Sequence, residues 1–452
     1  MGTLVRMCST RKTTDLSSYK TTKVVYISAS RQYAEQAFGI GLEPVKKSAF
    51  YFSHQALSFC LFCKPELQKM NRNLLYLLGI SLSLCQCTIE SSNATETIVQ
   101  MPDTKVWIGT YTRKEGHVDG KAAGIYHYAR RDSIWQLLHT TEGIINPSFL
   151  TLSPDGRYLY AVSETGPDVD TTGYVYAYAI IGDSLRFLSR QPTYSFAPCH
   201  VSVHPDGSQL FVTNYVGGTI VRYAIKQDGS LSTATDKLIL EGSGPHPRQD
   251  SSHPHSATVS PDGRWVMVAD LGTDLIHTFS AQGPQWAAGP SIKLPAGAGP
   301  RHLAFHPGAP YAYSINELNS TVTAFHYDAE NGALNIINHY ATLPSDYTGD
   351  NLSADIHLTP DGQYLYASNR GHNSLAGFAV NASSGALRAL GQTPTRGDFP
   401  RNFAIHPSGK ELWVANQNSD HIVVLRIDST SGQLRLLQEL EVPTPVCMAW
   451  GN

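Results

Sequence analysis

Four ionisable side chains stand at related places in consecutive segments of the chain: His255, Arg301, Glu317 and Arg370. A histidine, a carboxylate and two guanidinium groups are what acid–base chemistry on an anionic, carbonyl-containing substrate requires. Arg301 begins one short apolar stretch and Glu317 ends the next, with a turn at Pro307 between them. Because a hairpin returns the chain to its starting edge, we expect Arg301 and Glu317 to lie at the same edge of one sheet.

The same arrangement of short strand, proline turn and second strand occurs six times in the sequence. Proline presets φ at the second position of a turn, Asp tolerates the third, and Gly accepts the left-handed conformation that follows. Two more β-rich pieces follow each copy, and four strands in about 50 residues form one blade of a β-propeller. The turn prolines are 51, 56, 46, 53 and 47 residues apart: Pro154, Pro205, Pro261, Pro307, Pro360 and Pro407.

The two chain ends supply a seventh blade. Residues 106–111 match a second strand with no first strand before it, and residues 445–450 match a first strand with nothing after it. Pairing them closes the ring and hides an exposed strand edge. We therefore predict an all-β fold, a seven-bladed β-propeller over residues 101–452 whose C-terminal strand closes the N-terminal blade.

The first strand of each blade lines the axis of a propeller, so equivalent residues of all blades form rings. The residues six before the turn prolines are Ser148, Cys199, His255, Arg301, Ala354 and Arg401. The residues ten after them are Glu164, Tyr215, Leu271, Glu317, Arg370 and Gln417, with Tyr111 in the closing blade. Both rings mark the hairpin ends opposite the turn, so we expect both at one mouth. The alternative is an ion-pair network that only holds the blades in register.

Four further residues are candidates for substrate binding: His200, Glu164, Asp355 and Arg401. Arg401 is equally suited to a salt bridge between blades, and Asp355 stands one place off the ring position, where a structural role is the alternative. His253 and His255 suggest a metal, but no complete set of ligands at zinc spacing accompanies them, so we predict no metal.

Two kinds of residue follow the repeat too closely to mark a site. Asn or Asp recurs nine residues after the proline, which indicates a repeated hydrogen bond at the strand end. Histidines directly before the proline are read as repeat structure: His204, His306 and His406.

The chain before the repeats has a different character. Residues 1–69 contain no copy of the repeat and are left without a function. Arg72, an apolar run over residues 74–84 and Cys85 then resemble a secretory signal, with a possible lipid anchor at Cys85 or Cys87. A short buried helix is the alternative, because this run cannot span a bilayer. We expect an exported protein, periplasmic or anchored to the membrane as a lipoprotein, with mature protein starting after residue 80 and residues 70–100 forming signal and linker; a cytoplasmic protein is the alternative.

Composition excludes several classes of protein. Residues 1–69 hold ten Lys and Arg against four Asp and Glu, so the rest of the chain carries a net charge of −9. An acidic body without a basic stripe argues against a nucleic-acid partner. The repeats keep only Cys199 and Cys447, so we expect no disulfide framework there.

Several blocks in order carry a family likeness: residues 253–256, 299–307, 316–317, 353–357, 366–371 and 399–403. They resemble the seven-bladed lactonase family, which includes bacterial propeller-type 6-phosphogluconolactonases and a fungal carboxymuconate cycloisomerase. The resemblance runs from about Lys105 to Gly451. It implies a lactone-handling site, with His255, Arg301, Glu317 and Arg370 matching active-site residues of the cycloisomerase branch.

The leading hypothesis is hydrolysis of a sugar lactone, phosphorylated or not, by a monomer without a cofactor. Glu317 or His255 deprotonates the attacking water, while Arg301 and Arg370 bind the substrate anion or the developing oxyanion. The sequence has no Gly-x-Ser-x-Gly motif, which favours direct attack by water over an acyl-enzyme. The rivals are a cycloisomerase and a non-catalytic propeller that binds a protein or glycan.

Overall fold

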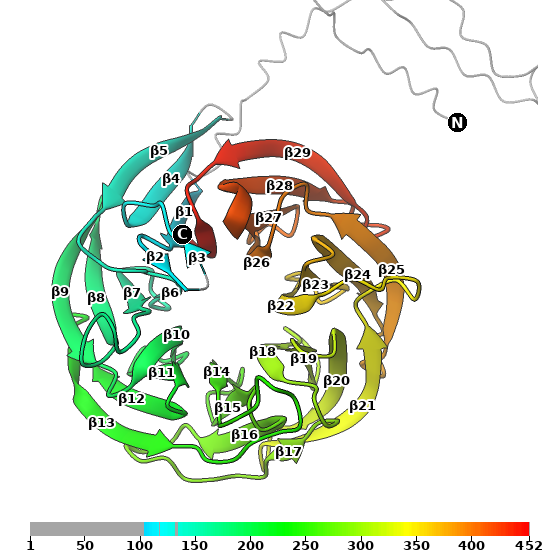
Figure 1. The fold of residues 1–452 in the computed structure, drawn as a ribbon, viewed down its shortest axis with the longest axis horizontal. Helices are drawn as coiled ribbons and strands as arrows, with labels where there is room; N and C mark the ends of the chain where they lie inside the picture. Colours follow the sequence, from blue (N-terminus) through cyan, green and yellow to red (C-terminus); the bar gives the residue numbers. More distant parts are fainter. Residues whose placement is uncertain (1–103, 117, 132–133, 452) are drawn as a thin grey trace, which may run out of the picture. The chain divides into compact units, whose positions relative to one another are not determined.

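A computed structural model describes residues 104–116, 118–131 and 134–451. The predictions for residues 1–69 and 70–100, including the anchor near Cys85 or Cys87, lie outside these ranges. The described chain forms seven four-stranded antiparallel sheets arranged as blades around one axis (Figure 1). The predicted all-β, seven-bladed β-propeller is therefore confirmed. Within the described ranges, no helix has the length and apolar character needed to cross a membrane.

Each blade runs from an innermost strand at the axis to an outermost strand at the rim. The innermost strands, from blade one to blade seven, are β30 (Pro445–Gly451), β6 (Leu150–Leu152), β10 (Phe196–Val203), β14 (Pro254–Val259), β18 (Pro300–Phe305), β22 (Leu352–Leu358) and β26 (Pro400–Ile405). Each contacts the next around the ring, and the contact between β30 and β6 closes it. Equivalent positions of the seven blades therefore meet at one axis.

The second, third and outer strands follow in the same order. The second strands are β1 (Lys105–Thr110), β7 (Tyr158–Ser163), β11 (Gln209–Val216), β15 (Trp265–Asp270), β19 (Tyr311–Asn316), β23 (Tyr364–Arg370) and β27 (Glu411–Asn416). The third strands are β4 (Ile125–Arg131), β8 (Tyr174–Ile181), β12 (Thr219–Ile225), β16 (Leu275–Ser280), β20 (Thr321–Asp328), β24 (Ser374–Val380) and β28 (His421–Ile427). The outer strands are β5 (Ile134–Thr141), β9 (Ser184–Pro192), β13 (Leu231–Ile239), β17 (Ile292–Lys293), β21 (Ala333–Ala341), β25 (Leu387–Pro394) and β29 (Leu434–Glu441).

Smaller elements complete the chain. The outer strand β17 has only two residues, because Pro284 and Pro290 precede it and proline cannot donate to a strand ladder. β2 (Lys114–Glu115) pairs with β3 (Val118–Asp119), and η2 (Gln417–Ser419) is a short 3-10 helix.

The two ends of the described chain complete blade one. β1 pairs antiparallel with β30, with Val106 opposite Trp450 and Gly109 opposite Cys447. The predicted closure is confirmed, and both strands gain a neighbour that satisfies their backbone groups.

The core lies between neighbouring blades. Tyr160 and Val162 of β7 pack in one cluster with Val212 of β11 and Val221 of β12, and all four are fully buried. Burying one such side chain stabilises the fold by roughly 1.5–3 kcal/mol, so blade-to-blade contacts hold the ring.

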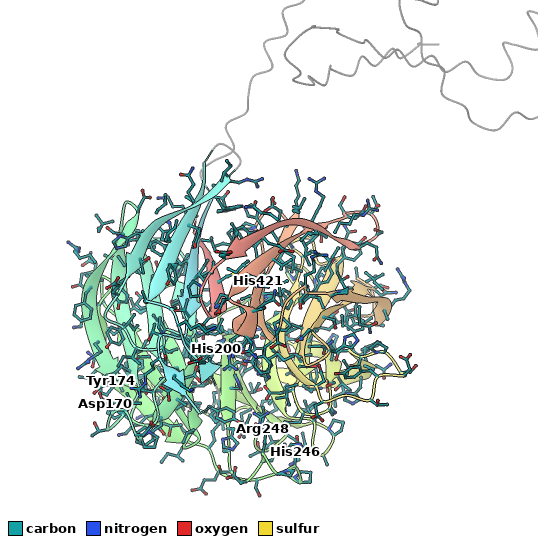
Figure 2. All side chains as sticks on the ribbon, turned by 45° about the horizontal axis from the view of Figure 1, so that its top comes forward. Asp170, Tyr174, His200, His246, Arg248 and His421 are labelled. Atoms are coloured by element: carbon teal, nitrogen blue, oxygen red, sulfur yellow. The ribbon has the colours of Figure 1, made fainter. Side chains whose placement is uncertain are left out.

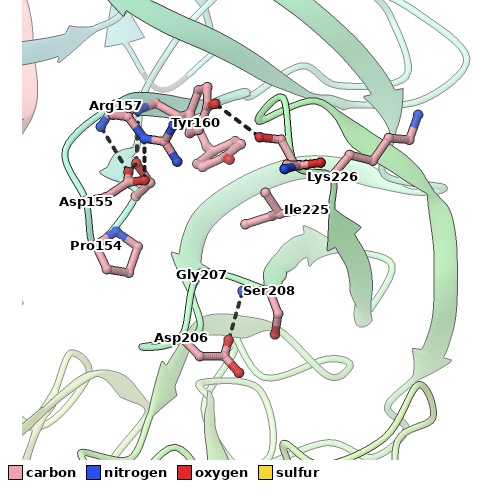
Figure 3. A pocket seen from close by; sticks show the side chains of 12 residues that line it. Pro154, Asp155, Arg157, Tyr160, Asp206, Gly207, Ser208, Ile225 and Lys226 are labelled. Atoms are coloured by element: carbon pink, nitrogen blue, oxygen red, sulfur yellow. Dashed lines mark hydrogen bonds and ion pairs between the residues drawn. The ribbon is translucent and has the colours of Figure 1, made fainter.

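The turns of sequence Pro-Asp-Gly, and the Pro-Ser-Gly turn of residues 407–409, lie at the opposite ends of the hairpins from the two rings. Their glycines have φ between 67° and 75°, which is the predicted left-handed conformation: Gly156, Gly207, Gly263, Gly362 and Gly409. Neighbouring turns line a surface pocket of about 640 Å³ including open solvent (Figure 3). Asp155 pairs there with Arg157 at 2.6 Å, and Asp206 accepts the backbone N–H of Ser208. These polar groups hold their own turns.

Candidate active site

Arg301 occupies a β-bulge in β18. The register of β18 with β19 skips it, passing directly from Pro300 to His302. A bulge bends the strand and re-aims its side chains. Arg301 and His302 are consecutive, yet both line one cavity at the axis.

The bulge recurs around the ring, at the predicted ring position. Strict alternation along a strand would send consecutive side chains to opposite faces, whereas a bulge lets two face the axis. The other residues skipped in this way are Cys199 in β10, His255 in β14, Ala354 and Asp355 in β22, Arg401 in β26 and Val446 in β30.

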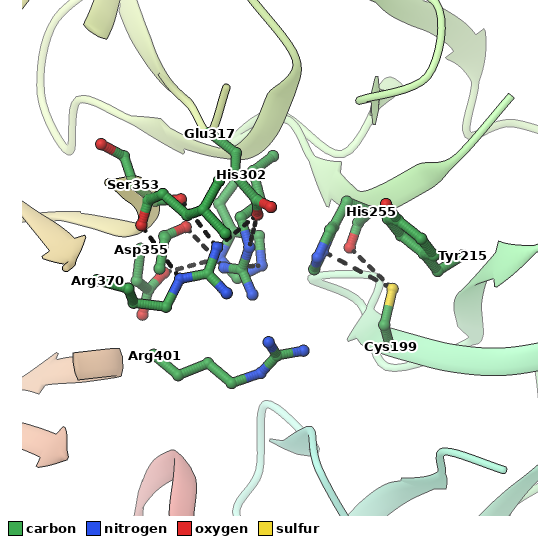
Figure 4. Close-up of polar contacts among 12 residues, drawn as sticks. Cys199, Tyr215, His255, His302, Glu317, Ser353, Asp355, Arg370 and Arg401 are labelled. Carbon is green, nitrogen blue, oxygen red and sulfur yellow. Dashed lines mark hydrogen bonds and ion pairs between the residues drawn. The ribbon is translucent and has the colours of Figure 1, made fainter. Parts of the chain in front are cut away.

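Glu317 pairs with both predicted arginines. Its Oε2 lies 3.0 Å from Nε of Arg301 and 2.6 Å from Nη2 of Arg370, and none of the three side chains is more than 4% exposed. The backbone N–H of Glu317 donates to the carbonyl of Gly299 at 2.8 Å, which fixes the hairpin end. The expectation that Arg301 and Glu317 share one sheet edge is confirmed, and blade six adds Arg370 (Figure 4).

A third guanidinium group, which the sequence did not single out, also reaches Glu317. Arg248 places Nη1 2.5 Å from Oε1 of Glu317 and donates from Nη2 to the Tyr215 hydroxyl at 2.9 Å. Arg248 belongs to the segment between β13 and β14, outside the repeated unit. The spacing of 56 residues between Pro205 and Pro261, the longest of the five, was the available signal.

These charges set the pKa of Glu317. Burial raises it, but Arg370, Arg248 and Arg301 outweigh burial and lower the pKa to about 2. Burial lowers the pKa of Arg370 to about 9, against the opposing effect of Glu317. At neutral pH all these groups are charged. A carboxylate this acidic is a weak base, so its contacts indicate that Glu317 positions the three guanidinium groups.

His255 lies beside Cys199 and Tyr215. Its Nδ1 is 3.7 Å from the Cys199 sulfur, and its ring meets the Tyr215 ring edge-on at 5.4 Å. Burial, then the charge of Arg301, lowers the pKa of His255 well below its usual value, so the imidazole is neutral and able to accept a proton. Burial raises the pKa of the Cys199 thiol to about 12, which keeps it protonated.

Arg401 and Glu164 face each other across the axis. Arg401 Nη2 lies 4.0 Å from Glu164 Oε1, and Glu164 Oε2 accepts the Tyr111 hydroxyl at 3.0 Å. The Arg401 guanidinium also lies over the Tyr111 ring, 5.7 Å from its centre. The salt bridge between blades that the sequence left open for Arg401 is present, although its length leaves the guanidinium group able to take another anion.

Asp355 is saturated by donors from within the protein. It accepts hydrogen bonds from the side chains of His302, His357 and Asn402 and from the backbone of Ile356 and Phe403. These bonds leave its oxygens committed, so the structural alternative for Asp355 fits better than direct substrate binding.

His302 links Asp355 to Arg301. Its Nδ1 is 2.7 Å from Asp355 Oδ1, and its Nε2 is 3.2 Å from Arg301 Nη1. Burial and the charge of Arg301 lower the pKa of His302 to about 4, so it is neutral and accepts from Arg301. Arg301 also donates to the carbonyl of Ala354 at 2.6 Å. Sequence reasoning missed His302 because the bulge was not foreseen.

His200 lies deeper in the same group. Its ring centre is 4.3 Å from Phe149 and 5.6 Å from His302, and burial lowers its pKa well below the usual value. The His200 ring is held by these tilted and edge-on ring contacts and by the backbone N–H of Ala257, which donates to its Nδ1 at 3.4 Å.

The first strands enclose a small cavity at the axis. It offers about 10 Å³ of room for the centre of a water-sized sphere, which is about what one water molecule needs. Its lining includes Ser148, Glu164, Cys199, Arg301 and Arg401. Figure 4 shows the Arg401 side chain extending between the Glu317 cluster and His255 with Cys199.

The site as a whole carries a positive charge. Four guanidinium groups face three carboxylates there: Arg248, Arg301, Arg370 and Arg401 against Glu164, Glu317 and Asp355. The excess favours an anionic ligand. Among the described residues, no group of three or more His, Cys, Asp or Glu side chains is arranged to hold a metal ion.

Three of the asparagines read as repeat structure make the same hydrogen bond in different blades. Each side chain donates to the carbonyl of the residue that directly follows the outer strand of the preceding blade. The pairs are Asn214 with Thr193, Asn369 with Thr342, and Asn416 with Thr395. His204 bonds through Nε2 to the carbonyl of Gly263 in the next blade's turn, at 2.7 Å.

Known proteins match this chain closely. The family described as "Lactonase, 7-bladed beta-propeller" matches residues 105–450. A 6-phosphogluconolactonase of Formosa agariphila is 37% identical over 313 residues, covering 66% of this chain and 86% of the relative. The 6-phosphogluconolactonase of Bacillus subtilis is 33% identical over 302 residues, covering 66% and 83%. The solved periplasmic gluconolactonase of Pseudomonas aeruginosa is 32% identical with a TM-score of 0.71, covering 77% of this chain and 99% of that one. This chain belongs to the seven-bladed β-propeller lactonase family.

Proposed function

We propose that this protein hydrolyses an anionic sugar lactone at the axis of the propeller, by attack of water on the lactone carbonyl. Membership of the lactonase family and the two relatives named 6-phosphogluconolactonase support lactone hydrolysis. The observation that carries the placement of the site is the cluster in which one buried carboxylate, Glu317, holds Arg248, Arg301 and Arg370 together.

His255 is the base in this proposal. Both candidate bases lie near the axis, but both carboxylate oxygens of Glu317 are engaged by guanidinium groups, whereas the neutral ring of His255 has its Nδ1 beside the Cys199 sulfur. A positioned general base contributes about 10²- to 10⁴-fold in rate. His255 takes a proton from the attacking water, the oxygen bonds to the lactone carbonyl carbon, and the proton passes to the alkoxide that leaves when the ring opens. The products are a hydroxyl group and a carboxylic acid, which ionises to the carboxylate and releases one proton to solvent.

Arg301 and Arg370 stabilise the oxyanion in this proposal. Their guanidinium groups are buried, and Glu317 fixes both. Donors held in place before the reaction need no reorganisation, and one such donor is worth about 2.7–4 kcal/mol of transition-state stabilisation. Arg401 and Glu164 line the small axial cavity, which has room for about one water molecule, so in this proposal they face the attacking water and the part of the substrate nearest to it. His200 packs against Phe149 of the same lining.

We propose further that the protein acts as an exported monomer. The periplasmic location in the name of the Pseudomonas aeruginosa relative and the pattern of Arg72, residues 74–84 and Cys85 support export, with or without a lipid anchor. N-terminal sequencing of exported protein should find a start after residue 80, and a start at Met1 would contradict export.

The test is a panel of purified lactones, with and without phosphate, assayed for acid release above the spontaneous rate. Hydrolysis predicts a carboxylate product and one proton released per ring opened. A cycloisomerase would instead convert a lactone into an unsaturated acid without taking up water, which the product mass distinguishes. No turnover of any lactone would favour the non-catalytic propeller.

A further inference from the structure

Arg248 differs from the other guanidinium groups that hold Glu317. Its side chain is 38% exposed, whereas those of Arg301 and Arg370 are 3% and 4% exposed. It comes from the segment between β13 and β14, where it stands beside His246 (Figure 2). Arg248 is therefore the member of the cluster that solvent, and an arriving solute, can reach.

The pairing of Glu317 makes Arg248 separable from the buried pair. Oε1 of Glu317 takes Arg248, and Oε2 takes both Arg301 and Arg370. Arg248 can therefore exchange Glu317 for another anion while the two contacts at Oε2 stay in place. The Tyr215 hydroxyl, which accepts from Arg248 at 2.9 Å, gives the guanidinium group a second fixed partner.

The segment that carries Arg248 is built to hold it. Gln249 is fully buried and donates from Nε2 to the carbonyl of Leu271 and to Oδ1 of Asp274, each at 2.7 Å. Oδ1 of Asp274 also accepts the backbone N–H of Gly299 at 2.8 Å. Gly299 stands two residues before Arg301, so one carboxylate ties the segment of Arg248 to the strand that begins the site.

The backbone of the segment is fixed as well. The Gly244 N–H donates to the carbonyl of Gln249 at 2.9 Å, and the Arg248 N–H donates to Nδ1 of His246 at 3.1 Å. A Cβ at Gly244 would lie 2.4 Å from Oε1 of Gln249, so a larger residue there would displace this buried amide group. The backbone at Arg248 is thus fixed, and the exposed guanidinium group is the part of the residue that can change its partner.

We propose that Arg248 is the specificity residue that receives the negatively charged group of the substrate distant from the lactone ring. This rests on the proposed function of the same site. The anion enters the mouth, takes the guanidinium of Arg248 from Oε1 of Glu317, and thereby places the lactone ring over the buried pair of Arg301 and Arg370. Phosphate and carboxylate share the required chemistry, because both match the two parallel N–H groups of arginine.

The first experiment measures KM and kcat for a phosphorylated and a non-phosphorylated gluconolactone with Arg248→Gln. A hydrogen bond to a charged group is worth enough that KM for the phosphorylated lactone should rise about tenfold or more. KM for the neutral lactone should change less than about threefold, so the ratio of the two KM values is the quantity that reports the role of Arg248. Arg248→Lys keeps the positive charge but loses the two parallel N–H groups of arginine. Its KM for the phosphorylated lactone should lie between those of the parent and Arg248→Gln.

A matched control comes from the rim. Arg396 is 54% exposed and pairs with Glu439 at 3.0 Å, so Arg396→Gln removes an ion-paired surface arginine away from the axis. It should leave both KM values at the parental level. Equal KM changes for the two lactones in Arg248→Gln would overturn the proposal.

A second readout does not depend on turnover. Titration calorimetry with 6-phosphogluconate, glucarate and gluconate measures recognition of a distant phosphate, a distant carboxylate and neither. The parent should bind at least one of the two acids that carry a second anionic group more tightly than gluconate, and Arg248→Gln should lose that preference. If parent and variant show the same preference for a second anionic group, the role of Arg248 is overturned. If the parent shows this preference but opens no lactone, only the proposed hydrolysis is overturned.

Discussion

Arg301 and Glu317 stand sixteen positions apart in the chain and meet at 3.0 Å, with Nε of the arginine against Oε2 of the carboxylate. The bulge in β18 aims Arg301 at the axis, and Glu317 directly follows the paired strand β19. Their contact occurs where both side chains are almost completely buried. The other two arginines of the cluster, Arg248 and Arg370, also pair with Glu317.

Replacing Glu317 by Gln should lower both stability and activity. The change keeps the shape but leaves three guanidinium groups close together without their carboxylate. Removing one partner of a buried ion pair costs about 3–5 kcal/mol, and we expect a loss of that order in the free energy of unfolding. Displaced arginines should lower kcat at least about 10²-fold. Denaturant unfolding and lactone kinetics measure the two effects; a variant with parental values of both would contradict the assignment.

The stability of the parent should depend on Glu317 at acidic pH. Its pKa in the folded protein, about 2, lies below its ordinary value of 4.5. The stabilisation is therefore complete above about pH 4.5 and is lost as the pH falls toward 2. Melting temperatures of the parent and Glu317→Gln, measured at intervals from pH 7 to pH 3, should converge as the pH falls. A constant difference between the two would show that Glu317 does not have a lowered pKa.

His255→Asn should slow the chemical step. As the proposed base, His255 accounts for about 10²- to 10⁴-fold in kcat. Because its pKa lies well below 6.5 and only the neutral ring accepts a proton, the parental kcat should stay constant above pH 6.5 and fall only at lower pH. The control is His326→Asn, an exposed position on β20. An unchanged kcat in His255→Asn would move the role of base to another residue.

Asp355→Ala should destabilise the propeller. It removes the acceptor of five hydrogen bonds and leaves buried donors on His302, Asn402 and Phe403 without a partner. We expect a loss of about 3–5 kcal/mol in the free energy of unfolding. The exposed Asp346→Ala serves as the control in the same denaturant titration. A loss below about 1 kcal/mol would mean that these bonds are not needed to hold the channel.

The repeat made most of the fold and part of the site predictable. The spacing of the turn prolines predicted the blades. The hairpin between Arg301 and Glu317 predicted that these two residues lie close together. His302 was missed because alternation along a strand assigns it to the far face, and only the bulge turns it inward. Arg248 was missed because its segment lies outside the repeat. The sequence shows that this segment is long, but not where its side chains lie relative to the axis.

The role of Glu317 could not be predicted from residue types alone. The sequence treats Glu317 and His255 as equal candidates for the base. Only three-dimensional contacts show that three guanidinium groups share this carboxylate, whereas the His255 ring lies against Cys199, Tyr215 and His302. Charge partners distant in sequence decide which group accepts a proton.

The most direct test of the axial site is kcat/KM for 6-phosphogluconolactone, measured for the parent and for Arg370→Ala after subtraction of spontaneous hydrolysis. Arg370→Ala leaves Glu317 paired with Arg248 and Arg301, so the fold should survive, as circular dichroism will show. The account predicts clear acceleration by the parent and a decrease of about 10²-fold or more in the variant. A folded variant that retains the parental kcat/KM would contradict the placement of lactone hydrolysis at this site.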